Sequence, residues 1–132
     1  MFTYQITVKM HDTDAAGILF FGHQFKMMHD AYEAFLEKIG FGFAVLLKEK
    51  KYFVPIVHAE ADYKQPLFVG DLLTISVYLE RVGDSSFSML YRLKRQGELV
   101  GSGKTVHVSI DKKTKKKISL PEEVRKALKK IN

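Results

Sequence analysis

The segment from Asp12 to His23 carries the residues whose types and spacing could do chemistry. It places Asp12 and Asp14 in a loop of small residues, which an apolar run joins directly to the expected start of a helix. The first N–H groups of a helix have no partner within it, and the positive end of its dipole favours negative charge. A carboxylate beside such donors can act as base or nucleophile while the N–H groups bind an oxyanion. The pattern also fits two aspartates that only stabilise turns, because short acidic side chains accept hydrogen bonds from nearby backbone N–H groups.

The sequence gives no support to a metal site or to a cysteine or serine nucleophile. His23 and His29 are six residues apart, on different faces of a helix, and the other three histidines stand alone in the chain. The chain has no cysteine, which excludes a thiolate ligand, a disulfide and a cysteine nucleophile. It also lacks the Gly-x-Ser-x-Gly segment that presents a serine nucleophile. We therefore expect carboxylate chemistry without a metal.

The elements that must position this loop begin with a long helix. Directly after the loop, apolar residues recur at alternating spacings of three and four, which draws one stripe along a helix: Phe25, Met28, Tyr32, Phe35 and Ile39. Gly40 is expected to end this helix, because glycine readily takes the left-handed conformation that follows a last turn. A shorter helix is expected around residues 43–48, and a last one over residues 121–131, where Pro121 leads into two glutamates.

Strands are expected on both sides of the long helix. A weak alternation predicts a first strand over residues 4–10, and four clearer ones follow over residues 54–63, 73–80, 87–94 and 105–110. Turn-forming pairs separate the later strands: Gly70-Asp71, Gly83-Asp84 and Gln96-Gly97. One strand, one long helix and then a run of antiparallel strands predict an α+β fold in which the helix packs against one face of the sheet.

The length of 132 residues predicts a single domain over residues 1–132, which includes a basic turn and helix at 112–132. The hydrophobic share of 46% and the charged share of 27% are ordinary for a globular protein. The first residues do not resemble a signal peptide, and no apolar stretch is long enough to span a bilayer. We therefore expect a cytoplasmic protein without membrane insertion.

The net charge of +6 comes from the C-terminal segment. Residues 1–111 hold 12 basic and 13 acidic residues, whereas residues 112–132 hold 9 basic and 2 acidic ones. The lysine run at 112–117 could bind nucleic acid, an anionic membrane or the phosphates of a cofactor, or it could be a solvated turn. No aromatic residue lies among these lysines, which disfavours single-stranded nucleic acid. We expect a solvated segment and no nucleic-acid partner.

Two strings of residues carry a family resemblance. The first is DTDAAGILFF at residues 12–21, and the second is VHAEADYKQPL at residues 57–67 with Gly70-Asp71 after it. Together they resemble the signature of the 4-hydroxybenzoyl-CoA thioesterase family, a group with the hotdog fold, in which a five-stranded antiparallel sheet wraps around one long helix. HDAYE at residues 29–33 and PLFVGD at residues 66–71 are more closely similar to the 1,4-dihydroxy-2-naphthoyl-CoA hydrolases of quinone biosynthesis.

The resemblance implies which residues are catalytic. Asp14 matches the family's catalytic carboxylate, and the backbone N–H of Phe21 matches the donor that polarises the thioester carbonyl. Asp12 would then only shape the loop. Where the naphthoyl-CoA enzymes commonly carry Tyr-Phe, this chain has Phe20-Phe21, so one phenol hydroxyl is missing. That change does not affect a role that Phe21 plays through its backbone.

The resemblance also implies a substrate and partners. The substrate would be an aromatic acyl-CoA whose phosphates meet basic side chains, and no separate cofactor is expected because coenzyme A is part of the substrate. The protein would be a homodimer with active sites at the interface and would assemble further to a homotetramer. Phe20 would border the acyl group and His23 lies near the expected oxyanion donor. His58 and Glu60 would line the pocket across the dimer, although a solvent-exposed position suits them equally.

Several alternatives stay open. A thiol with a pKa of about 8.5 leaves readily near neutral pH, so one carboxylate and one N–H donor suffice for thioester hydrolysis. Asp14 would attack the carbonyl and form a mixed anhydride, or it would activate water as a general base. Glu33 is the reserve, because a second branch of hotdog thioesterases has its catalytic glutamate on the long helix. A short-chain or fatty acyl-CoA thioesterase, a non-catalytic CoA-binding protein and a polyanion binder are the competing functions.

Overall fold

The computed structural model describes residues 1–131, so Asn132, the last residue of the expected C-terminal segment, lies outside the described residues. The elements follow in this order: β1 (Phe2–Thr7), the 3-10 turn η1 (Met10–Asp12), α1 (Phe21–Lys38), α2 (Phe43–Lys48), β2 (Tyr52–Phe53), β3 (Ile56–Tyr63), β4 (Leu72–Val82), β5 (Ser86–Arg95), β6 (Glu98–Val108), β7 (Ile110–Asp111), α3 (Glu122–Leu128) and the 3-10 turn η2 (Lys129–Ile131).

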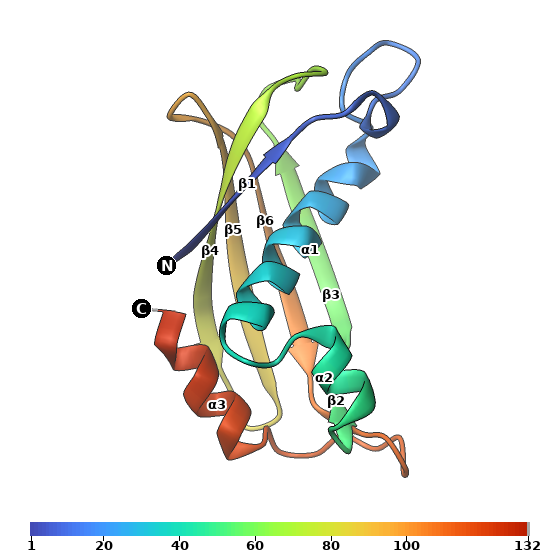
Figure 1. Ribbon diagram of the computed structural model, residues 1–132, viewed down its shortest axis with the longest axis vertical. Helices are drawn as coiled ribbons and strands as arrows, with labels where there is room; N and C mark the ends of the chain where they lie inside the picture. The colour runs from blue at the N-terminus through green and yellow to red at the C-terminus, as the bar shows by residue number, and fades with distance from the viewer. Residues whose placement is uncertain (132) are drawn as a thin grey trace.

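An antiparallel sheet forms the frame of the molecule. Within residues 1–131 it has five strands in the order β1-β4-β5-β6-β3, which leaves β3 at one edge. Figure 1 shows the sheet curving around α1, which crosses one of its faces, while α3 lies beside one end of β4. The predicted arrangement of one strand, a long helix and four further strands is confirmed. The alternation pattern does not predict the short separate pair formed by β2 and β7.

Helix α1 ends as the sequence predicts. Gly40 has a φ of +88°, in the left-handed region that glycine enters without strain. The Phe41 N–H donates to the Leu36 carbonyl over 2.9 Å, a bond that runs back across the last turn and closes it. The chain can therefore reverse direction at once and enter α2, whose bounds of Phe43–Lys48 match the prediction.

The apolar stripe of α1 is buried in one core with the sheet. Met28, Tyr32 and Phe35 are almost fully buried, together with inward-facing strand residues: Leu73, Ile75, Val77, Met89, Tyr91 and Leu93. Met28 approaches β6 so closely that a Cβ at Gly103 would stand 2.4 Å from the Met28 sulfur. Gly103 therefore allows α1 to lie this near to the sheet.

Four predicted boundaries are wrong. The strand expected at 105–110 is only the end of β6, which starts at Glu98 because Gly101 and Gly103 interrupt the apolar alternation without ending the strand, and Ile110 already belongs to β7. The first strand is Phe2–Thr7 rather than 4–10, because after Thr7 the chain turns and Val8 bonds to the Gly70-Asp71 turn instead of a strand. The strand expected at 54–63 begins at Ile56, since Pro55 has no N–H to continue a ladder. The last helix stops at Leu128 and tightens into a 3-10 turn.

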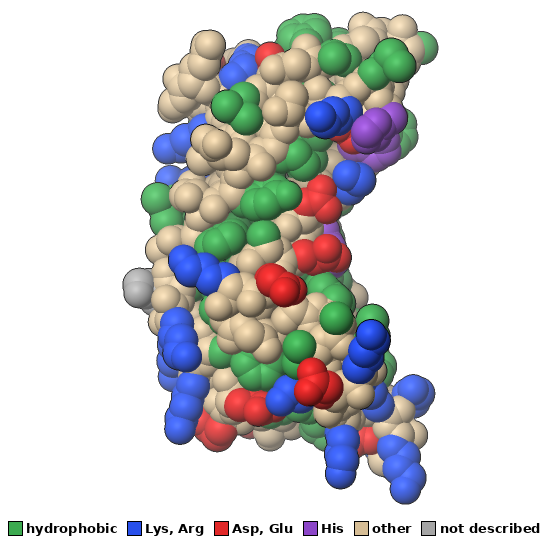
Figure 2. Space-filling view, viewed as in Figure 1, with side chains coloured by type: hydrophobic (Ala, Val, Ile, Leu, Met, Phe, Trp, Pro, Cys, Tyr) green, Lys and Arg blue, Asp and Glu red, His purple; other side chains and the backbone are tan. Residues whose placement is uncertain are grey.

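Part of the lysine run has a structural task. The Lys112 ammonium donates to the carbonyls of Leu46, Leu47 and Lys50, which are left without partners where α2 ends. Lys113, Lys116 and Lys117 are exposed, and Figure 2 shows basic side chains gathered at this end of the molecule. The residues of the run that remain exposed fit the solvated turn expected from the sequence. Along residues 1–131, no helix combines the length and the apolar character needed to cross a membrane.

Candidate functional site

Asp14 lies in an exposed loop that its own side chain organises. Its Oδ1 atom accepts hydrogen bonds from the N–H of Ala16 at 2.8 Å and of Ile18 at 3.4 Å. Gly17 takes a φ of +77° in the same turn, a conformation that a side chain would strain. The structure thus shows the turn-forming role that the sequence offers as an alternative. That role and catalysis do not exclude each other, because the turn also holds the carboxylate in one orientation.

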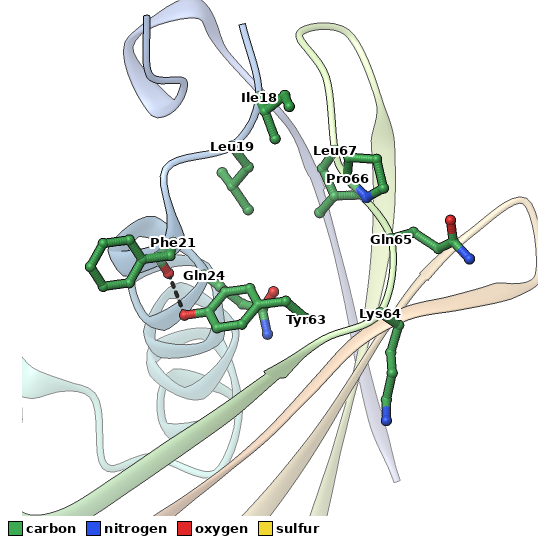
Figure 3. Close-up of a pocket in the computed structure, with 9 residues that line it drawn as sticks. All are labelled: Ile18, Leu19, Phe21, Gln24, Tyr63, Lys64, Gln65, Pro66 and Leu67. Atoms are coloured by element: carbon green, nitrogen blue, oxygen red, sulfur yellow. Dashed lines mark hydrogen bonds between the residues drawn. The ribbon is translucent and has the colours of Figure 1, made fainter. Parts of the chain in front are cut away.

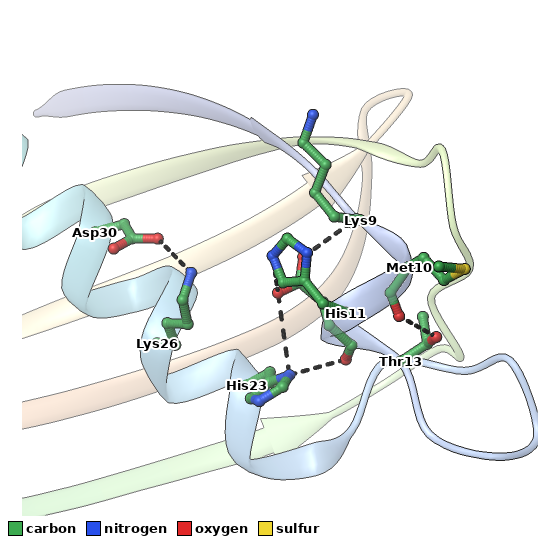
Figure 4. Close-up of polar contacts among 8 residues, drawn as sticks. Lys9, Met10, His11, Thr13, His23, Lys26 and Asp30 are labelled. Atoms are coloured by element: carbon green, nitrogen blue, oxygen red, sulfur yellow. Dashed lines mark hydrogen bonds and ion pairs between the residues drawn. The ribbon is translucent and has the colours of Figure 1, made fainter.

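Asp12 ties the loop to the start of α1. Its side chain is buried, and Oδ2 accepts the Lys9 N–H at 2.8 Å. Its backbone carbonyl accepts the Phe20 N–H at 2.9 Å. The same carbonyl lies 3.0 Å from the Nδ1 atom of His23, whose contacts Figure 4 shows. A carbonyl only accepts, so His23 must carry a proton on Nδ1 to make this bond. Asp12 therefore shapes the loop and sets the tautomer of His23.

The first turn of α1 provides the expected N–H donors. Phe21 is its first residue, and a first-turn N–H has no acceptor within the helix. The Phe21 carbonyl accepts the Tyr63 hydroxyl at 2.7 Å, which anchors the helix start to the end of β3. Tyr63 is half exposed, but partial desolvation of its hydroxyl raises its pKa, so the hydroxyl stays a donor at neutral pH. The rings of Phe20 and Phe21 are exposed and lie 4.7 Å apart.

A cavity of about 280 Å³ opens beside this helix start. It is lined mostly by apolar residues of the loop, of α1 and of the β3–β4 connection: Ile18, Leu19, Phe21, Gln24, Tyr63, Lys64, Gln65, Pro66 and Leu67 (Figure 3). Gln24 is buried and donates through Nε2 to the carbonyls of Asp62, at 3.0 Å, and Ser102, at 3.2 Å. The volume falls below the roughly 300–1,000 Å³ of pockets for drug-sized ligands, so it suits only part of an acyl-CoA.

Sequence reasoning misses Gln24 and Tyr63. Gln24 precedes Met28 by one helical turn, so it is a polar residue in register with the buried apolar stripe. A polar residue at such a position is a signal in the sequence for a buried polar group. Tyr63 lies within the second quoted string, but its bond to Phe21 joins residues 42 positions apart and leaves no local pattern.

The remaining predicted site residues lie elsewhere. His58 and Glu60 are exposed on β3 and pair with each other, with 2.9 Å between His58 Nε2 and Glu60 Oε1. Glu33 contacts His29 at 3.2 Å on a later turn of α1 and does not line the cavity. Within residues 1–131, no three His, Asp or Glu side chains form a group that could hold a metal ion.

The comparisons with known proteins agree on one family. The model of the thioesterase-like superfamily matches residues 8–128. A 1,4-dihydroxy-2-naphthoyl-CoA hydrolase of Prochlorococcus marinus (strain NATL1A) is 37% identical over 129 residues, which cover 89% of this chain and 83% of that protein. Its counterpart in Nostoc punctiforme is 37% identical over 123 residues, which cover 93% of this chain and 83% of that protein.

Solved structures agree as well. A 1,4-dihydroxy-2-naphthoyl-CoA thioesterase from Synechocystis superposes with a TM-score of 0.90 at 29% identity, and the match covers 96% of this chain and 94% of that one. A gentisyl-coenzyme A thioesterase superposes with a TM-score of 0.86 at 33% identity, and the match covers 96% of this chain and 98% of that one.

Proposed function

Because the chain belongs to the thioesterase-like superfamily, we propose that it hydrolyses the thioester of an acyl-CoA to a free acid and coenzyme A. The α+β hotdog fold predicted from the sequence is confirmed by the sheet order and by the superposition on solved thioesterases. One observation carries the proposal: the loop with the exposed Asp14 carboxylate leads into a helix start with free N–H groups, and an apolar cavity that Asp14 itself does not line opens beside that helix start.

We propose an aromatic acyl group, with 1,4-dihydroxy-2-naphthoyl-CoA as the first candidate. The relatives and one solved structure that match most of this chain carry that name, and another solved neighbour is named for a gentisyl thioester, also aromatic. The exposed rings of Phe20 and Phe21 offer flat apolar surfaces beside the free N–H groups. Aromatic rings pack well on such surfaces, which supports an aromatic over a polar acyl group.

The proposed chemistry uses two groups of this chain. Asp14 attacks the thioester carbonyl or takes a proton from an attacking water. The N–H of Phe21 donates to the carbonyl oxygen as negative charge develops on it, with the positive end of the α1 dipole behind it. Coenzyme A arrives with the substrate and leaves as a thiolate, so we propose no further cofactor. A cytoplasmic location also stays a prediction.

The test is an acyl-CoA panel with release of free thiol as the readout. We expect the highest kcat/KM with naphthoyl-CoA and benzoyl-CoA, and lower values with fatty acyl-CoA. Preferred hydrolysis of long fatty acyl-CoA would shift the proposal to the broader thioesterase. If the protein binds these compounds without releasing thiol, it is a CoA-binding protein and the hydrolase proposal fails.

We further propose that the protein is a homodimer whose active sites lie at the interface. The edge strand β3 supports this, because nearly all its residues are exposed and they include Ile56, Val57 and Tyr63. An exposed edge strand of this length offers unpaired N–H and C=O groups to another strand. Antiparallel pairing of β3 with its own copy about a two-fold axis satisfies both edges. Assembly of such dimers into a homotetramer stays a prediction.

The Val57→Asp variant tests the dimer. Val57 is 58% exposed in the single chain and would be buried by a partner, so a charge there should raise the dimer dissociation constant by at least about tenfold. Val69→Asp is the matched control, since Val69 is 53% exposed but lies in the β3–β4 connection. Sedimentation velocity over a dilution series measures the dimer dissociation constant of both variants. A Val57→Asp protein that remains as dimeric as the control would contradict the β3 interface.

A further inference from the structure

Two side chains hold the first turn of α1 against the sheet. The Tyr63 hydroxyl, at the end of β3, donates to the Phe21 carbonyl over 2.7 Å (Figure 3). The Gln24 amide donates to the carbonyls of Asp62, at 3.0 Å, and Ser102, at 3.2 Å. These two carbonyls belong to residues that are paired with each other on β3 and β6. The first turn is therefore bonded to two neighbouring strands at one level of the sheet.

The sheet leaves room for the Gln24 amide at one glycine. Gly101 on β6 is paired with Tyr63 on β3. A Cβ on Gly101 would stand 2.8 Å from the Gln24 Oε1 atom, which is closer than a real Cβ approaches another atom. Gln24 is only 1% exposed, so water does not compete for the two bonds that its amide donates. The amide is thus held by packing as well as by hydrogen bonds.

These bonds fix the N–H group that the proposed chemistry needs. The Phe21 N–H belongs to the peptide group that joins Phe20 to Phe21, and the carbonyl of that group accepts the His23 N–H at 2.9 Å. The next peptide group begins with the Phe21 carbonyl, which the Tyr63 hydroxyl holds. Because peptide groups are planar and both groups that flank the Phe21 Cα are held, φ and ψ of Phe21 are restricted and its N–H keeps one direction.

This helix start has little stability of its own. Phe20 takes the position before the helix and makes no side-chain cap, and Gly22 is the second helical residue, where glycine is flexible. A helix that begins in this way frays at its first turn unless contacts from outside the helix hold it. The bonds from Tyr63 and Gln24 are such contacts, so they keep the Phe21 N–H in its place.

We propose that Tyr63 and Gln24 are positioning residues of the hydrolysis, which aim the Phe21 N–H at the thioester carbonyl. This inference rests on the proposed thioesterase function. A donor that is fixed before the substrate arrives needs no reorganisation when negative charge develops on the carbonyl oxygen, and a small misplacement of the donor slows the reaction. Neither side chain touches the reacting atoms in this role. Both act through the first turn of α1.

The Tyr63→Phe variant removes one hydroxyl and keeps the ring. We expect kcat on benzoyl-CoA to fall about tenfold while KM changes less than about twofold, because the donor acts mainly as charge develops on the carbonyl oxygen. Gln24→Met keeps the side-chain length, removes both donors and should lower kcat in the same way. Tyr78→Phe is the control, since Tyr78 lies on β4 with its ring beside Arg92, and it should keep the wild-type kcat. An unchanged kcat in Tyr63→Phe, compared at equal oligomeric state by sedimentation velocity, would overturn the proposal.

The carbonyl stretch of a bound substrate reports on the donor directly. In the slow Asp14→Asn protein, benzoyl-CoA with a carbon-13 carbonyl can be followed by isotope-edited infrared spectroscopy. We expect binding to shift the stretch to lower wavenumber, because a hydrogen bond to the oxygen weakens the C=O bond, and we expect a smaller shift when Tyr63→Phe is added. A merely structural role of Tyr63 would leave the shift unchanged, and the inference would fail. Wild-type protein that releases no thiol from any acyl-CoA would instead refute the proposed function.

Discussion

The Asp14→Asn variant is expected to lose at least about a hundredfold in kcat on an aromatic acyl-CoA while folding normally. Asparagine is neither a nucleophile nor a base at this position, so either mechanism for Asp14 stops. The amide oxygen can still accept the N–H groups of Ala16 and Ile18, so the turn that Asp14 organises should survive. The loss should appear in kcat and kcat/KM together, because the substrate contacts are unchanged.

Two further variants make the Asp14 result decisive. Asp30→Asn removes a carboxylate that pairs with Lys26 at 3.3 Å on the exposed side of α1, and it should hydrolyse at the wild-type rate. Glu33→Gln removes the reserve carboxylate and should also leave kcat unchanged. Near-normal turnover by Asp14→Asn combined with loss of activity in Glu33→Gln would assign the protein to the second branch of hotdog thioesterases.

Labelled water separates the two mechanisms for Asp14. In a single turnover with excess enzyme in oxygen-18 water, a general base directs the label into the product acid. A nucleophile forms a mixed anhydride, and water that attacks its aspartyl carbonyl leaves the label in the Asp14 side chain. Label found by mass spectrometry in the peptide that contains Asp14 therefore identifies the nucleophilic mechanism.

The sequence predicts the parts of the fold that local periodicity controls. The stripe from Phe25 to Ile39 defines α1 because buried helical residues must recur every three or four positions, and Gly40 defines its end. The later strands follow from alternation in the same way. The boundary at Thr7 goes wrong because the pairing of Val8 with the Gly70-Asp71 turn, and not the local pattern, decides where the strand ends. The boundary at Pro55 goes wrong although its signal is local, since a proline has no N–H for a ladder.

The site is predictable only in part, for the same reason. The Asp14 loop stands out by composition, but only the family resemblance favours catalysis over a simple turn, and the structure shows the turn itself. The Tyr63 bond to Phe21 and the Lys112 cap on α2 join residues that lie more than 40 positions apart. Contacts of this kind depend on how the sheet curves around α1, so no window of sequence contains them.

A buried histidine gives the second large expected effect. His107 is stacked between Tyr32, at 4.5 Å between ring centres, and Phe87, at 4.7 Å. Its Nε2 atom lies 2.8 Å from Thr105 Oγ1, which is 2.9 Å from the Tyr91 hydroxyl, and its Nδ1 lies 3.4 Å from the Val54 carbonyl. The carbonyl can only accept, so Nδ1 carries the proton and Nε2 accepts from Thr105. Neutral His107 thus satisfies every group of this buried chain.

The stability of the protein should therefore fall as the pH falls below neutrality. Burial, together with the smaller effect of the nearby His29, lowers the pKa of His107 from its usual 6.5 to about 4. Above the pKa that the histidine has in the unfolded chain, the imidazole is neutral in both the folded and the unfolded protein. The stability therefore does not change with pH in that range. Between the two pKa values only the unfolded state binds the proton. The free energy of unfolding therefore falls as the pH falls through this range. The total loss on acidification to the folded pKa is about 3 kcal/mol.

The His107→Gln variant separates this effect from the titration of carboxylates. Glutamine cannot take up a proton, so the variant should be less stable than wild type at neutral pH, through the lost ring stacking, yet should lack the histidine's pH dependence. The gap in free energy of unfolding between wild type and variant should narrow by about 2 kcal/mol from about pH 7.5 to about pH 5, where most carboxylates stay ionised. Urea unfolding at one fixed protein concentration measures it, because the stability of a dimer depends on concentration. His11→Gln is the control, because His11 is exposed whereas His107 is fully buried, and it should leave the wild-type pH dependence intact. If the difference in free energy of unfolding between wild type and His107→Gln stays constant with pH, the core does not depend on the neutral imidazole.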